Sequence, residues 1–171
     1  MAKTKYGYCE TSDVKATIAG HIYSVKDDEN ILENGMIVKL GDIVDADEIH
    51  SVSTPATTDE VVLICSVLVD PTAQTTADKA EYYAYTDKGE VARAYEIGKR
   101  DRFTVADYMI TALDSKNGLQ VGNYIVSDGN RKYTEVASPD GYAFAAKIFA
   151  IESKSQLTIV RVEVISNTAT A

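Results

Sequence analysis

The chain has 171 residues, 45% of them hydrophobic and 25% charged, a composition typical of a folded globular protein that excludes disorder throughout. Its formal net charge is −9, and because an acidic protein repels phosphate backbones, we expect no nucleic-acid partner. The longest uncharged apolar run, residues 61–69, is too short to cross a bilayer, so we expect no membrane partner.

Residues 1–20 show neither the strand period nor the helix period, which predicts an N-terminal arm rather than a packed element. The candidate interface residues of this arm are Lys3, Lys5, Tyr6 and Tyr8. A terminal arm can simply fray, or it can lie along a neighbouring subunit with its tyrosines as anchors. We expect residues 16–25 to form a first pair of strands, bent at Gly20.

The rest of the chain alternates short apolar stretches with turn residues, the pattern of a β-barrel or β-sandwich. Strands are expected at residues 36–40, 49–53, 61–69, 83–86, 91–95, 108–111, 124–127, 132–137, 142–151 and 157–165, a turn at 104–107, and a short helix within 72–83. The predicted fold is mainly β: one small barrel or sandwich over residues 21–166, with one or two short helices, an extended N-terminal arm and a tail at 167–171.

Two stretches, residues 34–69 and 121–151, share one pattern. Each begins with an apolar run between two glycines and continues through a proline to a longer apolar segment. The leading glycines, Gly35 and Gly122, are 87 positions apart, and the two prolines are 84 apart. The domain could therefore be built from two related β-units. Such patterns also recur by chance in β-rich chains, and the sequence leaves both interpretations open.

No catalytic or metal-binding motif is present in the sequence. The two histidines, His21 and His50, lack the spacing of a metal site, and the glycines stand singly rather than in a phosphate-binding loop. The two cysteines, Cys9 and Cys65, have no second cysteine at ligand spacing, and a cytoplasmic chain keeps both reduced. We therefore expect a protein that is not an enzyme, with no cofactor and no metal.

Tyrosine dominates the aromatic residues, with eleven tyrosines against three phenylalanines and no tryptophan. Tyrosine suits interfaces because its ring packs while its hydroxyl stays in water. Further interface candidates are Tyr82, Tyr83, Tyr85, Lys99, Arg100 and Arg102. Ordinary strand packing would explain the tyrosines equally well, and the basic residues 99–102 could be a solvated turn or could meet an acidic face on a neighbouring copy.

An acidic face is predicted between residues 27 and 60, where ten acids and a single lysine account for the whole negative excess. Such a face usually serves solubility, and the alternative is a docking surface for a basic partner.

Several segments resemble small structural proteins encoded beside the capsid genes of tailed bacteriophages. The resemblance rests on residues 19–25, 33–41, 93–96, 103–108 and 121–129. It implies a head decoration, or cement, protein: a β-rich homo-oligomer, preferably a trimer, that binds the major capsid protein on the outside of an assembled shell. It implies no catalytic residue. With no basic and apolar leader at the start of the chain, we expect assembly in the host cytoplasm and a final place on the capsid exterior.

Two other functions compete with decoration. The first is a tail-tube or head–tail joining subunit of a phage, which would form tubes or rings. The second is a carbohydrate- or ligand-binding β-module, in which residues 82–85 would be a stacking platform.

Overall fold

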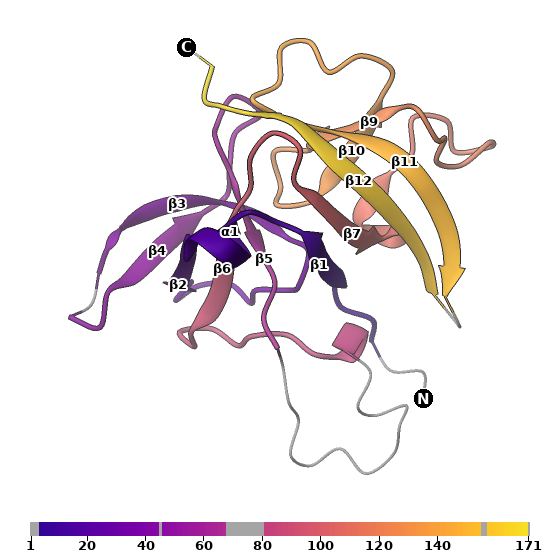
Figure 1. Ribbon diagram of the computed structural model, residues 1–171. Helices are drawn as coiled ribbons and strands as arrows, with labels where there is room; N and C mark the ends of the chain where they lie inside the picture. Colours follow the sequence, from indigo (N-terminus) through magenta and orange to yellow (C-terminus); the bar gives the residue numbers. More distant parts are fainter. Residues whose placement is uncertain (1–3, 45, 68–80, 155–156, 171) are drawn as a thin grey trace.

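The computed structural model describes residues 4–44, 46–67, 81–154 and 157–170, and the fold is mainly β, with 46% strand and 6% helix. A closed five-stranded barrel lies beside a second, seven-stranded sheet (Figure 1). This confirms the prediction of a small β-barrel or sandwich. In the described part of the chain, no helix is long and apolar enough to cross a membrane.

The barrel is formed by the strands that follow the first twenty residues. These are β2 (Ile22–Lys26), β3 (Ile37–Ile43), β4 (Ile49–Ser53), β5 (Val62–Ile64) and β6 (Ala92–Glu96), in the order β2-β4-β3-β5-β6. Pairing of β2 with β6 closes the barrel, and the only parallel pair in it joins β2 to β4. Its interior is apolar, with Val25, Ile37, Leu63 and Ala94 fully buried.

The second sheet is formed by the remaining strands. These are β1 (Cys9–Asp13), β7 (Arg102–Ala106), β8 (Ile110–Thr111), β9 (Tyr124–Ser127), β10 (Tyr133–Val136), β11 (Phe144–Lys154) and β12 (Leu157–Asn167), in the order β1-β7-β12-β11-β9-β10-β8. Phe103, Tyr133 and Phe144 pack together at its centre, with successive ring centroids 6.4 and 6.0 Å apart. All three rings are fully buried, and they are the largest fully buried side chains among the described residues.

The two halves of the chain share one strand topology. Read from β8, the second sheet runs β8-β10-β9-β11-β12, which matches β2-β4-β3-β5-β6 of the barrel strand for strand. The directions match as well, because the first pair is parallel in each half and the other three are antiparallel. The strand β2 of the barrel corresponds to three elements of the second half: β7, the short 3₁₀ turn η2 (Asp107–Met109) and β8.

The hydrogen bonds around the two leading glycines correspond atom for atom. The Gly35 amide donates to the Ile64 carbonyl (2.7 Å), and the Ile64 amide donates to the Met36 carbonyl (2.8 Å). In the second half, the Gly122 amide donates to Ile148 (2.9 Å) and the Ile148 amide donates to Asn123 (2.9 Å). Both glycines have a positive φ, which only glycine adopts without strain. The barrel and the second sheet therefore share one strand topology and the same hydrogen bonds at their leading glycines.

Buried polar contacts join the barrel to the second sheet. The Tyr133 hydroxyl donates to the Gly35 carbonyl (2.8 Å), and the buried Arg131 guanidinium lies 2.6 Å from the Asp27 carboxylate. The Asn167 side chain accepts a hydrogen bond from the Val61 amide (2.9 Å) and donates to the carbonyls of Val61 and Ile97. The hydrogen-bonding groups of the barrel and those of the second sheet are both buried where they meet. Separating the two units would leave these groups unsatisfied, so the units pack as one domain.

The prediction of an N-terminal arm is wrong for most of residues 1–20. Residues 9–13 form β1, which pairs with β7 of the same chain, and Tyr8, Cys9 and Val14 are buried. The segment was mispredicted as an arm because four of the five residues of β1 are polar, so no apolar alternation shows, and the strand forms through its backbone pairing with β7.

Residues 16–25 are not a bent strand pair. Ala16–Ala19 form the single turn of helix α1, and only β2 at Ile22–Lys26 is a strand. Gly20 ends the helix in the left-handed conformation, and its amide donates to the Ala16 carbonyl (2.9 Å). The buried side chain of Ala16 anchors this turn.

Other boundaries also differ from those predicted. Residues 72–80 of the expected helix lie outside the described residues, and residues 81–83 form a 3₁₀ turn, η1 (Glu81–Tyr83). The expected strand at 83–86 is reduced to one bridge between Thr86 and Leu32. The turn expected at 104–107 lies at Asp107–Met109, because β7 continues to Ala106.

Candidate functional site: a cluster of tyrosines

Five tyrosines from three separate segments gather near the N-terminus. Tyr6 precedes β1, Tyr82 and Tyr83 form η1, Tyr85 follows η1, and Tyr108 lies in η2. The ring centroids of Tyr6 and Tyr85 are 4.4 Å apart, and those of Tyr82 and Tyr83 are 4.6 Å apart. We call these five residues the tyrosine cluster.

Hydrogen bonds from backbone and side-chain groups hold the three segments of the cluster in place. The Tyr6 amide donates to the Tyr82 carbonyl (2.7 Å), and the Tyr108 hydroxyl donates to the Tyr6 carbonyl (2.6 Å). The next amide, that of Gly7, donates to the Glu33 carboxylate (2.7 Å). Gly7 is required here because a Cβ would lie 2.2 Å from the Asn34 carbonyl oxygen. The cluster is thus ordered before any partner arrives.

The rings of the cluster are partly open to solvent. Tyr85 and Tyr108 are 37% and 39% exposed, and Tyr6, Tyr82 and Tyr83 are half-buried. Desolvation, followed by the charge of Glu33, raises the pKa of Tyr108 to about 12, so its hydroxyl stays protonated as a donor. Burial likewise raises the pKa of Tyr82, and the Lys5 ammonium lies 5.7 Å from the Tyr82 ring centroid. The surface combines aromatic rings, neutral hydroxyls and one cation.

Tyr8 belongs to a different group. Its side chain is buried, its hydroxyl donates to the Glu10 carboxylate, and the Lys154 ammonium donates to its hydroxyl (3.2 Å). Lys154 also forms an ion pair with Glu10, which lowers the pKa of that carboxyl and raises the pKa of the lysine. Tyr8 therefore connects the N-terminal segment to the end of the β11–β12 hairpin.

The basic candidates do not join the tyrosine cluster. The Arg102 guanidinium pairs with Asp13, the Arg100 amide donates to the Val164 carbonyl (2.8 Å), and the Lys99 carbonyl accepts from Lys15 (3.5 Å). These three residues lie beside β7 and β12, and Lys3 lies outside the described residues.

Of the ten candidates from the sequence, the structure brings together Lys5, Tyr6, Tyr82, Tyr83 and Tyr85. Tyr108 was missed, because it lies 102 positions from Tyr6 and only the fold makes them neighbours.

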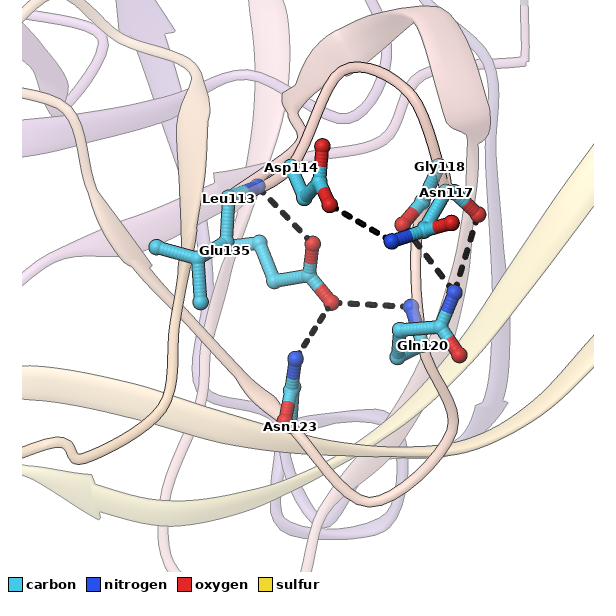
Figure 2. A pocket seen from close by; sticks show the side chains of 7 residues that line it. All are labelled: Leu113, Asp114, Asn117, Gly118, Gln120, Asn123 and Glu135. Carbon is cyan, nitrogen blue, oxygen red and sulfur yellow. Dashed lines mark hydrogen bonds between the residues drawn. The ribbon is translucent and has the colours of Figure 1, made fainter.

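A polar pocket of about 420 Å³ opens where residues 113–120 cross β10 (Figure 2). At its base the fully buried Glu135 carboxylate accepts hydrogen bonds from the amides of Leu113 (2.9 Å) and Gln120 (2.8 Å) and from the Asn123 side chain (2.8 Å). In the described part of the chain, no lysine or arginine forms an ion pair with this carboxylate. Because its donors come from the loop itself, Glu135 holds the loop against the sheet.

The two histidines lie apart, and each contacts one polar group. His21 Nδ1 lies 2.8 Å from the Glu96 carboxylate on the surface, and His50 Nδ1 lies 2.9 Å from the Gly41 carbonyl. Among residues 4–44, 46–67, 81–154 and 157–170, no group of three acidic, histidine or cysteine side chains could hold a metal ion.

Comparison with known proteins finds no match: no family model fits the chain, and no curated protein and no solved structure is significantly similar to it.

Proposed function

We propose that this chain is an auxiliary structural protein that binds the outer surface of an assembled phage capsid, against the major capsid protein, and stabilises it. The observation that supports the proposal is the tyrosine cluster, a pre-ordered aromatic surface on a stiff β-body. Tyrosine is enriched among the residues that contribute most to protein interfaces. The resemblance of several segments to head decoration proteins supplies the kind of partner.

Order in the free protein favours binding at this surface. Immobilising a flexible side chain costs about 0.5–1.5 kcal/mol on association. The backbones of Tyr6 and Tyr82 are already joined by a hydrogen bond, and the Tyr108 side chain is held by its bond to the Tyr6 carbonyl, so these segments lose little further freedom when a partner binds. On a capsid many equivalent sites are presented together, so a modest affinity at each site suffices when the copies are linked to one another.

A second candidate is a carbohydrate-binding module. Tyr82 and Tyr83 are tilted at 48° to one another, and Tyr6 and Tyr85 at 49°, so ring faces and edges are both presented. Such rings can stack on sugars as well as on protein side chains. A tail-tube or head–tail joining subunit is the third candidate, and no specific contact favours it.

Sedimentation with empty capsids of the encoding phage tests the proposal. The variant Tyr83→Ala/Tyr85→Ala should lower capsid occupancy at least about tenfold, as loss of interface anchors does. The matched control is Tyr142→Ala, a half-buried tyrosine in the turn before β11 and outside the cluster. Equal occupancy for wild type and double variant would overturn the tyrosine cluster as the docking surface.

The same preparation separates the other candidates. A carbohydrate module would be identified by two results together. The wild type would bind sugars on a glycan array but not the capsid, and the double variant would lose the sugar binding. Long tubes formed by the protein alone, without capsid binding, would identify a tail part. A copy number of hundreds per virion supports decoration of the shell, whereas a handful of copies opposes it.

A further inference from the structure

A shallow groove lies on the outer face of the second sheet, away from the tyrosine cluster. It has a volume of about 200 Å³ and is lined by Arg102 of β7, Lys147 and Phe149 of β11, and Glu163 and Ile165 of β12. This volume is below the usual 300–1,000 Å³ of small-molecule pockets. The groove is large enough for a side chain of another protein rather than for a free ligand.

Two β-bulges create the apolar part of this groove. In the β11–β12 ladder, Ala145 pairs with Ser166 and Ala146 with Val164, so Ile165 is an extra residue. Ile148 then pairs with Val162 and Ala150 with Arg161, so Phe149 is the extra residue of the opposite strand. Bulges re-aim side chains and commonly mark functional positions. Here the two bulged residues line the same groove, and Phe149 remains 45% exposed.

The surroundings of the groove carry a positive excess. Lys99, Arg100, Arg102 and Lys147 are exposed, and the Arg100 amide binds the carbonyl of Val164, next to Ile165. Against these four cations stand three acids: Asp13 beside Arg102, Glu163 between Arg102 and Lys147 in the ladder, and Asp101, which is buried and accepts hydrogen bonds from the Lys15 and Gly98 amides. An apolar groove with a basic rim fits an apolar segment flanked by acids.

Such a segment exists on the same chain, at the end of the β3–β4 hairpin. Ile43 and Val44 are 57% and 53% exposed, although they are aliphatic residues. Exposed Asp42, Asp47 and Glu48 flank them, and no Lys or Arg occurs between residues 40 and 53. We call residues 42–44 and 46–48 the acidic tip.

The tip cannot reach the groove of its own molecule. The β3–β4 hairpin projects at one side of the barrel, and β11 and β12 lie on the opposite side of the protein (Figure 1). The two surfaces are therefore available to different molecules at once.

We propose that the acidic tip of one molecule docks in the bulge groove of a second copy, with Ile43 placed against Phe149 and Ile165. The carboxylates of Asp42, Asp47 and Glu48 then face the basic rim of the groove. Two different surfaces meet in this contact, so it runs head to tail and joins copies into a ring or a chain. The proposal does not depend on the identity of the surface that the tyrosine cluster binds.

Sedimentation velocity over a concentration series is the test. The wild type should associate, and salt raised from about 50 mM to about 500 mM should weaken the association, because the contact is partly electrostatic. Ile43→Glu removes the tip and Phe149→Asp removes the groove, and each variant alone should stay monomeric. Val91→Ser, a change at another exposed aliphatic residue, is the matched control and should associate like the wild type.

A mixture of the two variants gives the decisive result. The groove of Ile43→Glu and the tip of Phe149→Asp are both intact, so the mixture should form a 1:1 dimer and nothing larger. A wild type that stays monomeric at all concentrations would overturn the proposal. So would association of either single variant at the wild-type level, or a mixture that contains only monomers.

Discussion

The hydroxyl of Tyr133, a fully buried side chain of the second sheet, donates a 2.8 Å hydrogen bond to the carbonyl of Gly35 in the barrel. Burial raises the pKa of Tyr133 well above its usual value, so the hydroxyl remains a protonated donor at neutral pH. The bond reaches the residue that leads the central strand of the first unit. It ties the core of one unit to the turn of the other.

Removing this hydroxyl should destabilise the whole molecule. Tyr133→Phe keeps the ring against Phe103 and Phe144 but leaves the Gly35 carbonyl without its donor. A buried group left unsatisfied costs about 1–3 kcal/mol. Urea unfolding should show this loss as a lower midpoint in one cooperative transition, whereas Tyr142→Phe should leave the midpoint unchanged.

The ion pair between Asp27 and Arg131 should make stability fall in acid. Burial raises the pKa of Asp27, but hydrogen bonds from the Glu29 amide, the Arg131 guanidinium and the Asn30 amide outweigh it, so the pKa is lowered. A carboxyl with a lower pKa in the folded state adds stability above its unfolded pKa of about 3.9. This contribution is lost as the pH falls through the folded pKa.

Substitution of the same carboxyl should remove that pH dependence. Asp27→Asn leaves the Arg131 guanidinium buried without its counter-ion, at a cost of about 3 kcal/mol. Unfolding free energies measured between pH 2 and pH 7 should fall less steeply in acid for the variant. If the unfolding free energies of the variant and the wild type changed in parallel with pH, Asp27 would not be the source of the acid destabilisation. Asp28→Asn is the control, because Asp28 is exposed.

Glu135→Gln should loosen residues 113–123 without unfolding the sheet. The carboxylate accepts three hydrogen bonds, and a glutamine amide would turn its NH₂ group toward one of these donors. The cost should be about 1–3 kcal/mol. Hydrogen exchange at the Leu113 and Gln120 amides should accelerate, with exchange in β11 changed less. Glu152→Gln, at an exposed residue, is the control.

The two leading glycines should differ sharply when replaced by alanine. Both need a positive φ, which costs an alanine about 1–2 kcal/mol. At Gly35 the new Cβ would also lie 2.8 Å from Met109 Sδ and 2.9 Å from the Tyr8 carbonyl oxygen, whereas at Gly122 no atom lies within 4 Å. Gly35→Ala should therefore lower the urea midpoint clearly more than Gly122→Ala. An equal effect would mean that the contacts at Gly35 relax freely.

The β class and most strand positions could be predicted because strands leave a local trace in the sequence. Apolar runs bounded by glycine or proline mark β4, β9 and β10 within one residue of where they lie, and β3 within three. The N-terminal segment was mispredicted because β1 forms by pairing with β7, which its own residues do not reveal. Helix α1 was mispredicted because a single helical turn is too short to show a helical period.

The tyrosine cluster was predictable in part, by residue type but not by arrangement. Tyr82, Tyr83 and Tyr85 are near neighbours in sequence, whereas Tyr6 and Tyr108 join them only through the fold. The acidic tip is visible in the sequence as a run of acids around two aliphatic residues. The groove is not, because a bulge depends on how two strands align and not on the residues of either one.

By itself, the amino-acid sequence determined the β-rich class, the turns at glycine and proline, and the separation of an acidic segment from a tyrosine-rich one. Only the tertiary structure decided that the two halves share one topology and that a groove and a tip lie on opposite sides. The reason is physical. Sheet pairing is made by backbone groups that every residue carries, so two segments with few residues in common can form the same hydrogen bonds.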